Sequence, residues 1–305
     1  MANSIWTNLE HLSVSLPSGD THGKIYANGN MQVAVQVNVK AVDKHGLPVQ
    51  LIEEDIDSIV LIDNNSGGRL MNGWGFSRSE NSYLHTMPDQ VAEKAPGEEV
   101  DPRVQIFTFW VSCHVVSIIA IGASIVAPDG TVYNTREAGS TFYSYIMLEG
   151  VNIPKYTLTD VDFTRFDTAK PVSSTGIIVD QDNYYLSLKN GLSIVAVDWM
   201  TNEIPLFAAI NQSSSAQLYY AWPLAYASQY VINDSPVAGL GELEIIINDR
   251  AGQVCFSRIA CGNVPLDAVI DTAATFTVFD QYGTAGHFSV TQNAKSFMMK
   301  IENYL

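Results

Sequence analysis

Basic residues and charges of either sign are scarce in this chain of 305 residues. Lys and Arg total 16 against 32 Asp and Glu, which gives a formal net charge of −16. A surface of that sign repels phosphate backbones and anionic lipid, so we expect no binding to nucleic acid and no electrostatic docking on membranes. Charged residues make up only 16% of the chain, so uncharged Ser, Thr, Asn and Gln must cover much of the exterior.

Signals for export, for disulfide formation and for membrane spanning are also missing. The first residues, MANSIWTNLEHLSVSLPSG, lack the basic start and apolar run of a secretory signal. We therefore expect synthesis in the cytosol without a signal peptide, followed by release or incorporation into a particle. Cys113, Cys255 and Cys261 are odd in number and have no framework spacing, which predicts reduced, buried thiols. No stretch reaches the roughly 20 apolar residues of a spanning helix, and the nearest, Val115–Ala127, is typical of a strand buried on both faces.

Sequence motifs of catalysis are absent too. The six histidines are scattered, and no pair has the H-x-x-x-H spacing of metal ligands on a helix. There is no G-x-S-x-G, no Walker loop and no G-x-G-x-x-G after a strand. Cys113 and His114 are adjacent on a predicted strand, which directs the two side chains to opposite faces and argues against a thiolate–imidazole pair. We therefore expect a protein that is not an enzyme.

Alternation of apolar and polar residues is the clearest positive signal. Residues 31–42 read MQVAVQVNVKAV, with apolar side chains at every odd position up to Val39. A period of two places successive side chains on opposite faces of a strand, so one face is buried and the other is wet. The turn Asp43–Gly46 follows, and the alternation then resumes.

Turn sequences between such runs predict a chain made of hairpins. They occur at Asn28-Gly29, Ala127–Thr131, Asn190-Gly191 and Asn248–Gly252. Asn-Gly between alternating runs is a strong hairpin signal, and Asn190-Gly191 has the best flanks, YYLSLK and LSIVAVDW. Further strands are predicted at 104–112, 139–148, 243–248, 254–259, 275–279 and 287–291. Only Glu53–Ser58 and part of Ser213–Trp222 could form short helices, so the predicted fold class is all-β.

Length and linker composition predict two domains. The segment Asn152–Thr175 mixes prolines, serines and threonines, and we place the boundary near its start. The acidic segment Asp89–Arg103 is expected to be an exposed loop of the first domain. Residues 1–153 and 154–305 would then each form an antiparallel β-sandwich of immunoglobulin-like or jelly-roll-like type.

One acidic segment could hold a metal ion. Asp180, Asp182 and Asn183 have the alternate spacing of oxygen ligands, which calcium prefers. The segment does not continue into a glycine turn with a distal Glu, and capping of a turn by Asp and Asn is the commoner use. We therefore expect no cofactor, with calcium as the alternative that this segment leaves open.

A charge-free aromatic stretch could bind a partner. Residues 213–232 read SSSAQLYYAWPLAYASQYVI, and they include Tyr219, Tyr220, Trp222, Tyr226 and Tyr230. Tyr and Trp combine a large apolar face with a polar group, so they gather at interfaces and at sites that stack sugars. The other interpretation is that this segment lines the core of the second domain. Trp74, in the run Gly-Trp-Gly-Phe, is a further candidate for sugar stacking.

The run Asn30–Leu51, with its long alternating strand, D-x-x-G turn and following Pro-Val, resembles the opening hairpin of bacterial immunoglobulin-like modules. Such modules occur in adhesins of the invasin type and in phage tail and capsid decorations. The resemblance implies a β-sandwich without enzymatic activity that acts as a rigid spacer or binding surface. It carries over no functional residue, because the matching residues form the scaffold.

These observations favour a non-catalytic structural or binding protein that assembles with itself, as a homo-oligomer, or recognises a protein or glycan surface. Two alternatives remain open. The first is a toxin that inserts β-hairpins from Val115–Ala127 and Ser213–Ile232 into membranes. The second is a carbohydrate-binding protein that stacks sugars on Trp74, Tyr220 or Trp222.

Overall fold

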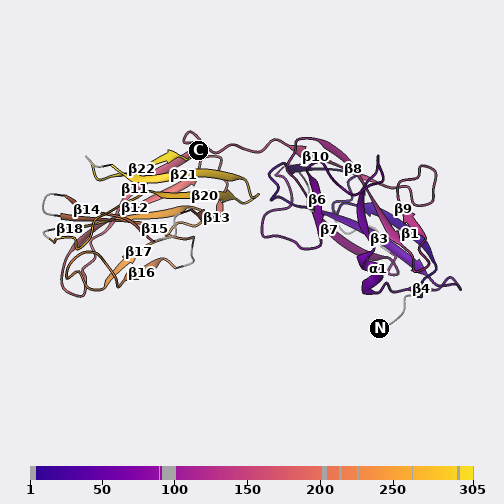
Figure 1. The fold of residues 1–305 in the computed structure, drawn as a ribbon, viewed down its shortest axis with the longest axis horizontal. Coiled ribbons are helices and arrows are strands. Elements are labelled where there is room, and N and C mark those ends of the chain that lie inside the picture. Colours follow the sequence, from indigo (N-terminus) through magenta and orange to yellow (C-terminus); the bar gives the residue numbers. More distant parts are fainter. Residues whose placement is uncertain are drawn as a thin grey trace. The chain divides into compact units, whose positions relative to one another are not determined.

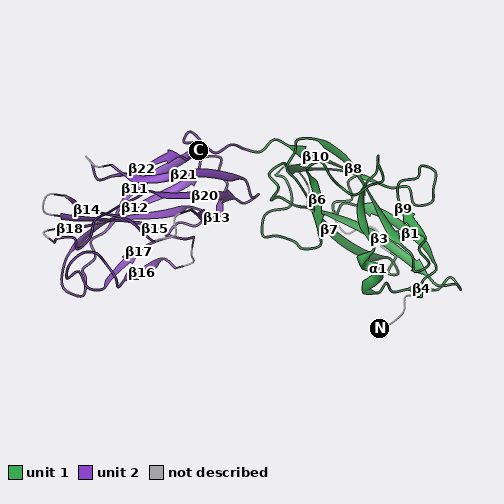
Figure 2. Cartoon of the chain, viewed as in Figure 1, with its two compact units in different colours: residues 1–153 green, residues 154–305 purple. Residues whose placement is uncertain are grey.

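A computed structural model describes residues 5–88, 90, 101–200, 205–212, 215–224, 227–262, 264–293 and 296–304. The chain divides into two compact units, Met1–Ile153 (unit 1) and Pro154–Leu305 (unit 2) (Figure 2). Both are built almost entirely of strands (Figure 1), which confirms the predicted all-β class. In the described part of the chain, no helix is long and apolar enough to cross a membrane. The predicted loop Asp89–Arg103 and the site residue Tyr226 lie largely or wholly outside the described residues.

Unit 1 contains two five-stranded sheets. The first has the order β1-β3-β7-β6, with β4 paired to β3, and the second has the order β2-β10-β8-β5, with β9 paired to β8. The strands are β1 (Asn8–Ser15), β2 (His22–Tyr26), β3 (Val33–Val42), β4 (Pro48–Val49), β5 (Val60–Asp63), β6 (Trp74–Ser77), β7 (Gln105–Cys113), β8 (Ile118–Val126), β9 (Val132–Asn134) and β10 (Ile146–Val151). The short helix α1 (Glu53–Asp57) precedes β5 and confirms the helix predicted there.

The strand order of unit 1 is that of an immunoglobulin sandwich. If β1, β3, β5, β6, β7, β8 and β10 are lettered A to G, the two sheets read A-B-E-D and C-F-G. One pairing departs from the predicted antiparallel pattern, because β2 runs parallel to β10 and adds a strand to the second sheet. The immunoglobulin-like topology therefore follows from this unit's own strand pairing.

The core of unit 1 lies between the inward faces of the two sheets. Val35, Val37 and Val39 of β3 are fully buried, as the alternation predicts. They are joined in the core by residues of the neighbouring strand and of the other sheet: Phe109, Val111, Ile121, Ala123 and Ile125. The expectation that Val115–Ala127 is buried on both faces is wrong at its ends, because Ile118 and Val126 are exposed on the outer face of β8.

Two of the predicted hairpins form. Asp43–Gly46 joins β3 to its partner β4, and Asp43 accepts hydrogen bonds from the backbone N–H of His45 and Leu47, which lowers the pKa of its carboxyl. Ala127–Thr131 joins β8 to β9, with Gly130 at φ +87°.

The turns that contain Asn28-Gly29, Asn190-Gly191 and Asn248–Gly252 do not form hairpins, because the strands on either side belong to different sheets. A two-residue hairpin of type I′ requires positive φ at both central residues. Gly191 has φ +79°, but Asn190 is not among the described residues with positive φ. The chain therefore leaves one sheet at Asn190 and enters another.

Unit 2 consists of three layers of strands. The largest sheet has the order β11-β12-β18-β15-β14-β19, the second β13-β20-β21-β22, and the third is the pair β16-β17. The strands are β11 (Val161–Ala169), β12 (Val179–Leu188), β13 (Ile194–Trp199), β14 (Leu206–Gln212), β15 (Ser215–Ala221), β16 (Gln229–Ile232), β17 (Leu243–Ile246), β18 (Val254–Gly262), β19 (Ile270–Asp271), β20 (Ala274–Asp280), β21 (Ala285–Gln292) and β22 (Met299–Asn303).

The six-stranded sheet carries a hydrophobic core on each face. Tyr184 and Phe256 lie in one core with Phe276 of the four-stranded sheet. Their chain neighbours Tyr185 and Cys255 lie in the other core, which includes residues of β16 and β17. Because both faces are covered, β12, β15 and β18 are buried along most of their length.

The segment 213–232 is part of this central sheet. The prediction that part of Ser213–Trp222 is helical is wrong, since residues 215–221 form β15 between β14 and β18. Residues 118–126 likewise form β8, which pairs with β10, β5 and β9. Insertion of either segment into a bilayer would require a packed sheet to open.

Candidate functional site

The aromatic residues predicted to bind a partner lie in the interior. Tyr219, Tyr220 and Trp222 are at most 3% exposed. Tyr219 faces the core shared with β20 and β21, whereas Tyr220 and Trp222 face the core shared with β16 and β17. Burial raises the pKa of the Tyr219 phenol to about 12. Of the described residues of this segment, Tyr219, Tyr220 and Trp222 therefore occupy the core position, whereas Tyr230 is 43% exposed.

Trp222 is fixed by its neighbours. Its indole Nε1 donates a hydrogen bond to Ser257 Oγ at 2.9 Å. Its ring stacks on Tyr220, with centroids 5.2 Å apart and planes 10° apart, and it contacts Tyr230 at 4.9 Å. Trp222 and Tyr230 also line a mainly apolar cavity of about 280 Å³, together with Pro205 and Pro223. Of these three rings, only Tyr230 is substantially exposed.

Trp74, the aromatic candidate in unit 1, is also buried. It begins β6, at the edge of the first sheet, and its Nε1 donates a hydrogen bond to Ser117 Oγ at 2.9 Å. The preceding Gly73 has φ +91°, and a side chain at this position would meet Val115. Trp74 therefore closes an end of the sandwich, and its ring has no face that a sugar could stack on.

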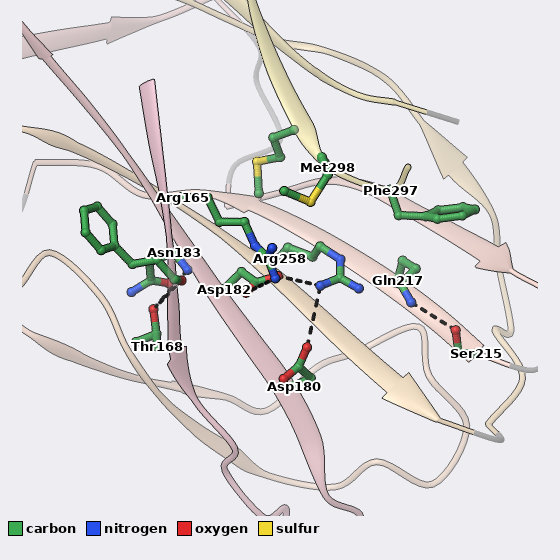
Figure 3. A network of polar contacts seen from close by, with 12 residues as sticks. Arg165, Thr168, Asp180, Asp182, Asn183, Ser215, Gln217, Arg258, Phe297 and Met298 are labelled. Atoms are coloured by element: carbon green, nitrogen blue, oxygen red, sulfur yellow. Dashed lines mark hydrogen bonds and ion pairs between the residues drawn. The ribbon is translucent and has the colours of Figure 1, made fainter. Parts of the chain in front are cut away.

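The residues predicted to share a calcium ion do not converge. Asp182 and Asn183 are successive residues of β12 and point to opposite faces of the six-stranded sheet. Asp182 is fully buried between two guanidinium groups (Figure 3): Arg165 Nη2 lies 2.8 Å from its Oδ1 and Arg258 Nη1 lies 2.6 Å from its Oδ2. Asp180 lies 3.7 Å from Arg258 on the same face. The carboxylates thus neutralise two cations, which corrects the expectation of a three-residue site.

Asn183 belongs to a second network, on the opposite face. Its Oδ1 accepts hydrogen bonds from Gln181 Nε2 at 2.9 Å and from Ser257 Oγ at 2.6 Å. Its Nδ2 donates to the backbone carbonyl of Ile246 at 2.9 Å. This carbonyl belongs to β17, so the amide ties the central sheet to the two-stranded layer. Buried polar groups satisfied in this way fix the register of the elements they join.

The other ionisable groups that the structure describes are not arranged as metal ligands. The described residues include no cluster of three or more His, Cys, Asp or Glu with metal-binding geometry. The three cysteines are unpaired and buried, and burial raises the pKa of the thiols of Cys113, Cys255 and Cys261 to about 11. Few of these thiols are ionised at neutral pH, so they pack as small apolar groups.

Two exposed tyrosines outside the predicted sites lie on the connection from β9 to β10 of unit 1. Tyr143 and Tyr145 are 45% and 38% exposed, and their rings meet edge to face with centroids 5.8 Å apart. Between them, Ser144 N–H donates to Thr135 O, and Ser144 Oγ accepts a hydrogen bond from Val14 N–H of β1. We call Tyr143 and Tyr145 the tyrosine surface. The sequence TFYSY was its only signal.

The position of the tyrosine surface follows from the fold. β8 and β10 correspond to the F and G strands of the immunoglobulin sandwich, so this connection is an F–G loop at one end of the unit. End loops of such sandwiches are positioned by a rigid scaffold and commonly carry recognition. The site therefore differs from every residue singled out in the sequence.

No protein-family model matches the sequence, and no curated protein does. Among solved structures, the chain is similar to the Yersinia pseudotuberculosis adhesin InvE, with 11% identity, a TM-score of 0.18, and coverage of 93% of this chain and 58% of that one. It is similar to the C-terminal domain of the Streptococcus agalactiae AgI/II polypeptide BspA (11% identity, TM-score 0.24, 96% and 100% covered). It is also similar to that of the Streptococcus pyogenes antigen I/II-family protein AspA (11%, 0.21, 97% and 100%). TM-scores this low do not establish a common fold, and the immunoglobulin-like assignment rests on the strand order of unit 1.

Proposed function

We propose that this chain is a non-catalytic recognition protein that associates with a second copy of itself through the tyrosine surface of unit 1. The observation that carries the proposal is the exposure of Tyr143 and Tyr145, two neighbouring aromatic rings on a loop held by the sandwich. Tyrosine has only two side-chain torsions and offers both apolar area and a hydroxyl, so it binds at a low cost in conformational entropy. Aromatic residues are accordingly enriched in the cores of protein interfaces.

The fixed backbone of this loop supports the same role. The bond from Ser144 N–H to Thr135 O closes the loop next to the end of β9, and the bond from Val14 N–H to Ser144 Oγ joins it to β1, the edge strand of the first sheet. A loop held at two points loses little freedom when a partner binds, and such preorganisation favours affinity.

The net negative charge predicts how self-association depends on the salt concentration. Two copies that each carry a formal charge of −16 repel one another at long range. Salt screens that repulsion, whereas contact between uncharged tyrosines is little affected. Self-association is therefore expected to strengthen as the salt concentration rises.

Sedimentation velocity at micromolar concentrations tests the proposal. The wild-type chain should show reversible association, and the double variant Tyr143→Ser/Tyr145→Ser should sediment as a monomer with an unchanged thermal transition. Tyr304→Ser removes a similarly exposed tyrosine from unit 2 and serves as the matched control. A wild-type chain that stays monomeric at every concentration and salt level would refute self-association, and a double variant that associates like the wild type would refute the assigned surface.

A further inference from the structure

Unit 1 has a second feature, separate from the tyrosine surface: a cavity of about 380 Å³ on the outer face of its first sheet. Ala34 and Gln36 of β3 form its floor with Thr108 and Trp110 of β7, and these four residues are cross-strand partners. The volume lies within the range of small-molecule binding sites.

The walls of this cavity are polar and contain no Lys or Arg among the described residues. Asp20 contributes from the segment before β2, His22 from the first position of β2, and Glu80 and His85 from the segment after β6. The described lining therefore offers two carboxylates as acceptors, one of them already bonded to His85, and no lysine or arginine that could neutralise an incoming anion. An anionic ligand would be repelled, whereas a neutral ligand rich in hydroxyl groups could donate hydrogen bonds to both carboxylates.

The floor supplies polar groups that are not used elsewhere. Within the described residues, the side chains of Gln36 and Thr108 have no hydrogen-bond partner. An amide and a hydroxyl can each donate and accept, which is the pattern that a sugar hydroxyl also presents. Trp110 adds an aromatic surface against which the C–H groups of a sugar ring can pack.

The wall formed by the segment after β6 is held in place. His85 Nε2 lies 3.0 Å from Glu80 Oε1, and the His85 ring contacts Trp110 with centroids 4.4 Å apart. Asn81 secures the segment to the start of β3, since its N–H donates to Gln32 Oε1 at 2.8 Å and its Nδ2 to Asn30 O at 2.6 Å.

One polar atom of this wall lacks a partner. His85 Nδ1 is buried and has no hydrogen-bond partner in the described part of the chain. Because this atom is not accessible from the open cavity, it is not counted among the groups that could bond a ligand.

From these contacts we propose that the cavity binds a neutral saccharide, with Gln36, Thr108, Asp20 and Glu80 bonded to its hydroxyls and Trp110 against its ring. This inference is independent of the proposed self-association. The proposed sugar site therefore differs from the one expected at Trp74, Tyr220 or Trp222, whose rings are buried.

Isothermal titration of the full chain with glucose, galactose, mannose, N-acetylglucosamine and glucuronate tests the proposal. At least one neutral sugar should bind, and glucuronate should bind about tenfold more weakly than glucose because of the two carboxylates. Absence of binding by all four neutral sugars, or binding of glucuronate as tight as that of glucose, would overturn the proposal.

Two variants test whether the sugar binds in this cavity. Thr108→Val keeps the shape of the residue but removes the hydroxyl, and it should weaken binding by about three- to tenfold. Trp110→Leu should weaken it further, with the thermal transition recorded to show that the unit still folds. Thr164→Val removes an exposed hydroxyl from β11 of unit 2 and should leave the affinity unchanged. Wild-type affinity in the Thr108→Val variant would contradict the assignment of the cavity.

Discussion

Replacement of Asp182 by Asn tests whether the buried ion pairs of Asp182 stabilise the central sheet of unit 2. The wild-type carboxylate is fully buried, with Arg165 and Arg258 bonded to its two oxygens. An amide keeps the shape but removes the negative charge, so both guanidinium groups lose their main counter-ion. Arg165 is 40% exposed and can be solvated by water, whereas Arg258 is only 14% exposed and cannot.

The expected loss in the free energy of unfolding depends on this difference in exposure. Removal of one partner of a buried ion pair costs about 3–5 kcal/mol, because the other charge stays buried without compensation. Asp180 lies 3.7 Å from Arg258 and retains part of the attraction, so the expected loss is near the lower end, about 3 kcal/mol. For a unit of this size, a loss of about 1 kcal/mol lowers Tm by about 2–4 °C, so the expected decrease is roughly 6–12 °C.

Differential scanning calorimetry of the full chain measures this decrease. Asp162→Asn is the matched control, because Asp162 forms an exposed pair with Lys189 and its loss should cost less than about 1 kcal/mol. Removal of both charges in Asp182→Asn/Arg258→Met should recover part of the lost stability, because no unpaired cation is then buried. An Asp182→Asn variant as stable as Asp162→Asn would refute the view that the network stabilises the central sheet.

Two further predictions concern buried groups. Since burial raises the pKa of Cys113, Cys255 and Cys261 from 9.0 to about 11, the thiols favour the folded state fully below pH 9, and this stability is lost as the pH rises through 9–11. Calorimetry should show a Tm whose fall between pH 9 and 10, below the ordinary pKa of tyrosine, becomes shallower when all three cysteines are replaced by Ala, and an unchanged slope would contradict the assignment. Trp222→Phe removes the bond to Ser257 and should cost about 1–2 kcal/mol in urea denaturation, whereas no loss would show that this bond is not a stabilising contact.

Much of the fold could be predicted because local patterns determine it. The alternation in β3 identifies its buried face, and the Asp43–Gly46 turn closes a real hairpin, since neither depends on distant residues. The Asn190-Gly191 turn shows the limit of such reasoning. Its sequence fits a hairpin, but the two flanking strands lie in different sheets of unit 2. Which sheet a strand joins depends on distant residues, so a local pattern cannot predict it.

The candidate sites were harder to predict because they depend on what covers each face. The charge-free sequence around Tyr219 and Trp222 suits an interface as well as a core, and only the presence of layers on both faces of the central sheet decides between them. Asp182 and Asn183 looked like neighbouring ligands, but adjacent strand residues point in opposite directions. Tyr143 and Tyr145 are exposed because their loop lies at the end of the sandwich, which depends on the topology.

The measurement that addresses the proposed role most directly is hydrogen–deuterium exchange of the wild-type chain at low and at high protein concentration. If copies meet through the tyrosine surface, amides of residues 142–146 should exchange more slowly at high concentration, and those around β16 and β17 should not change. Protection that appears only in unit 2, or exchange of residues 142–146 that does not depend on concentration, would contradict the account.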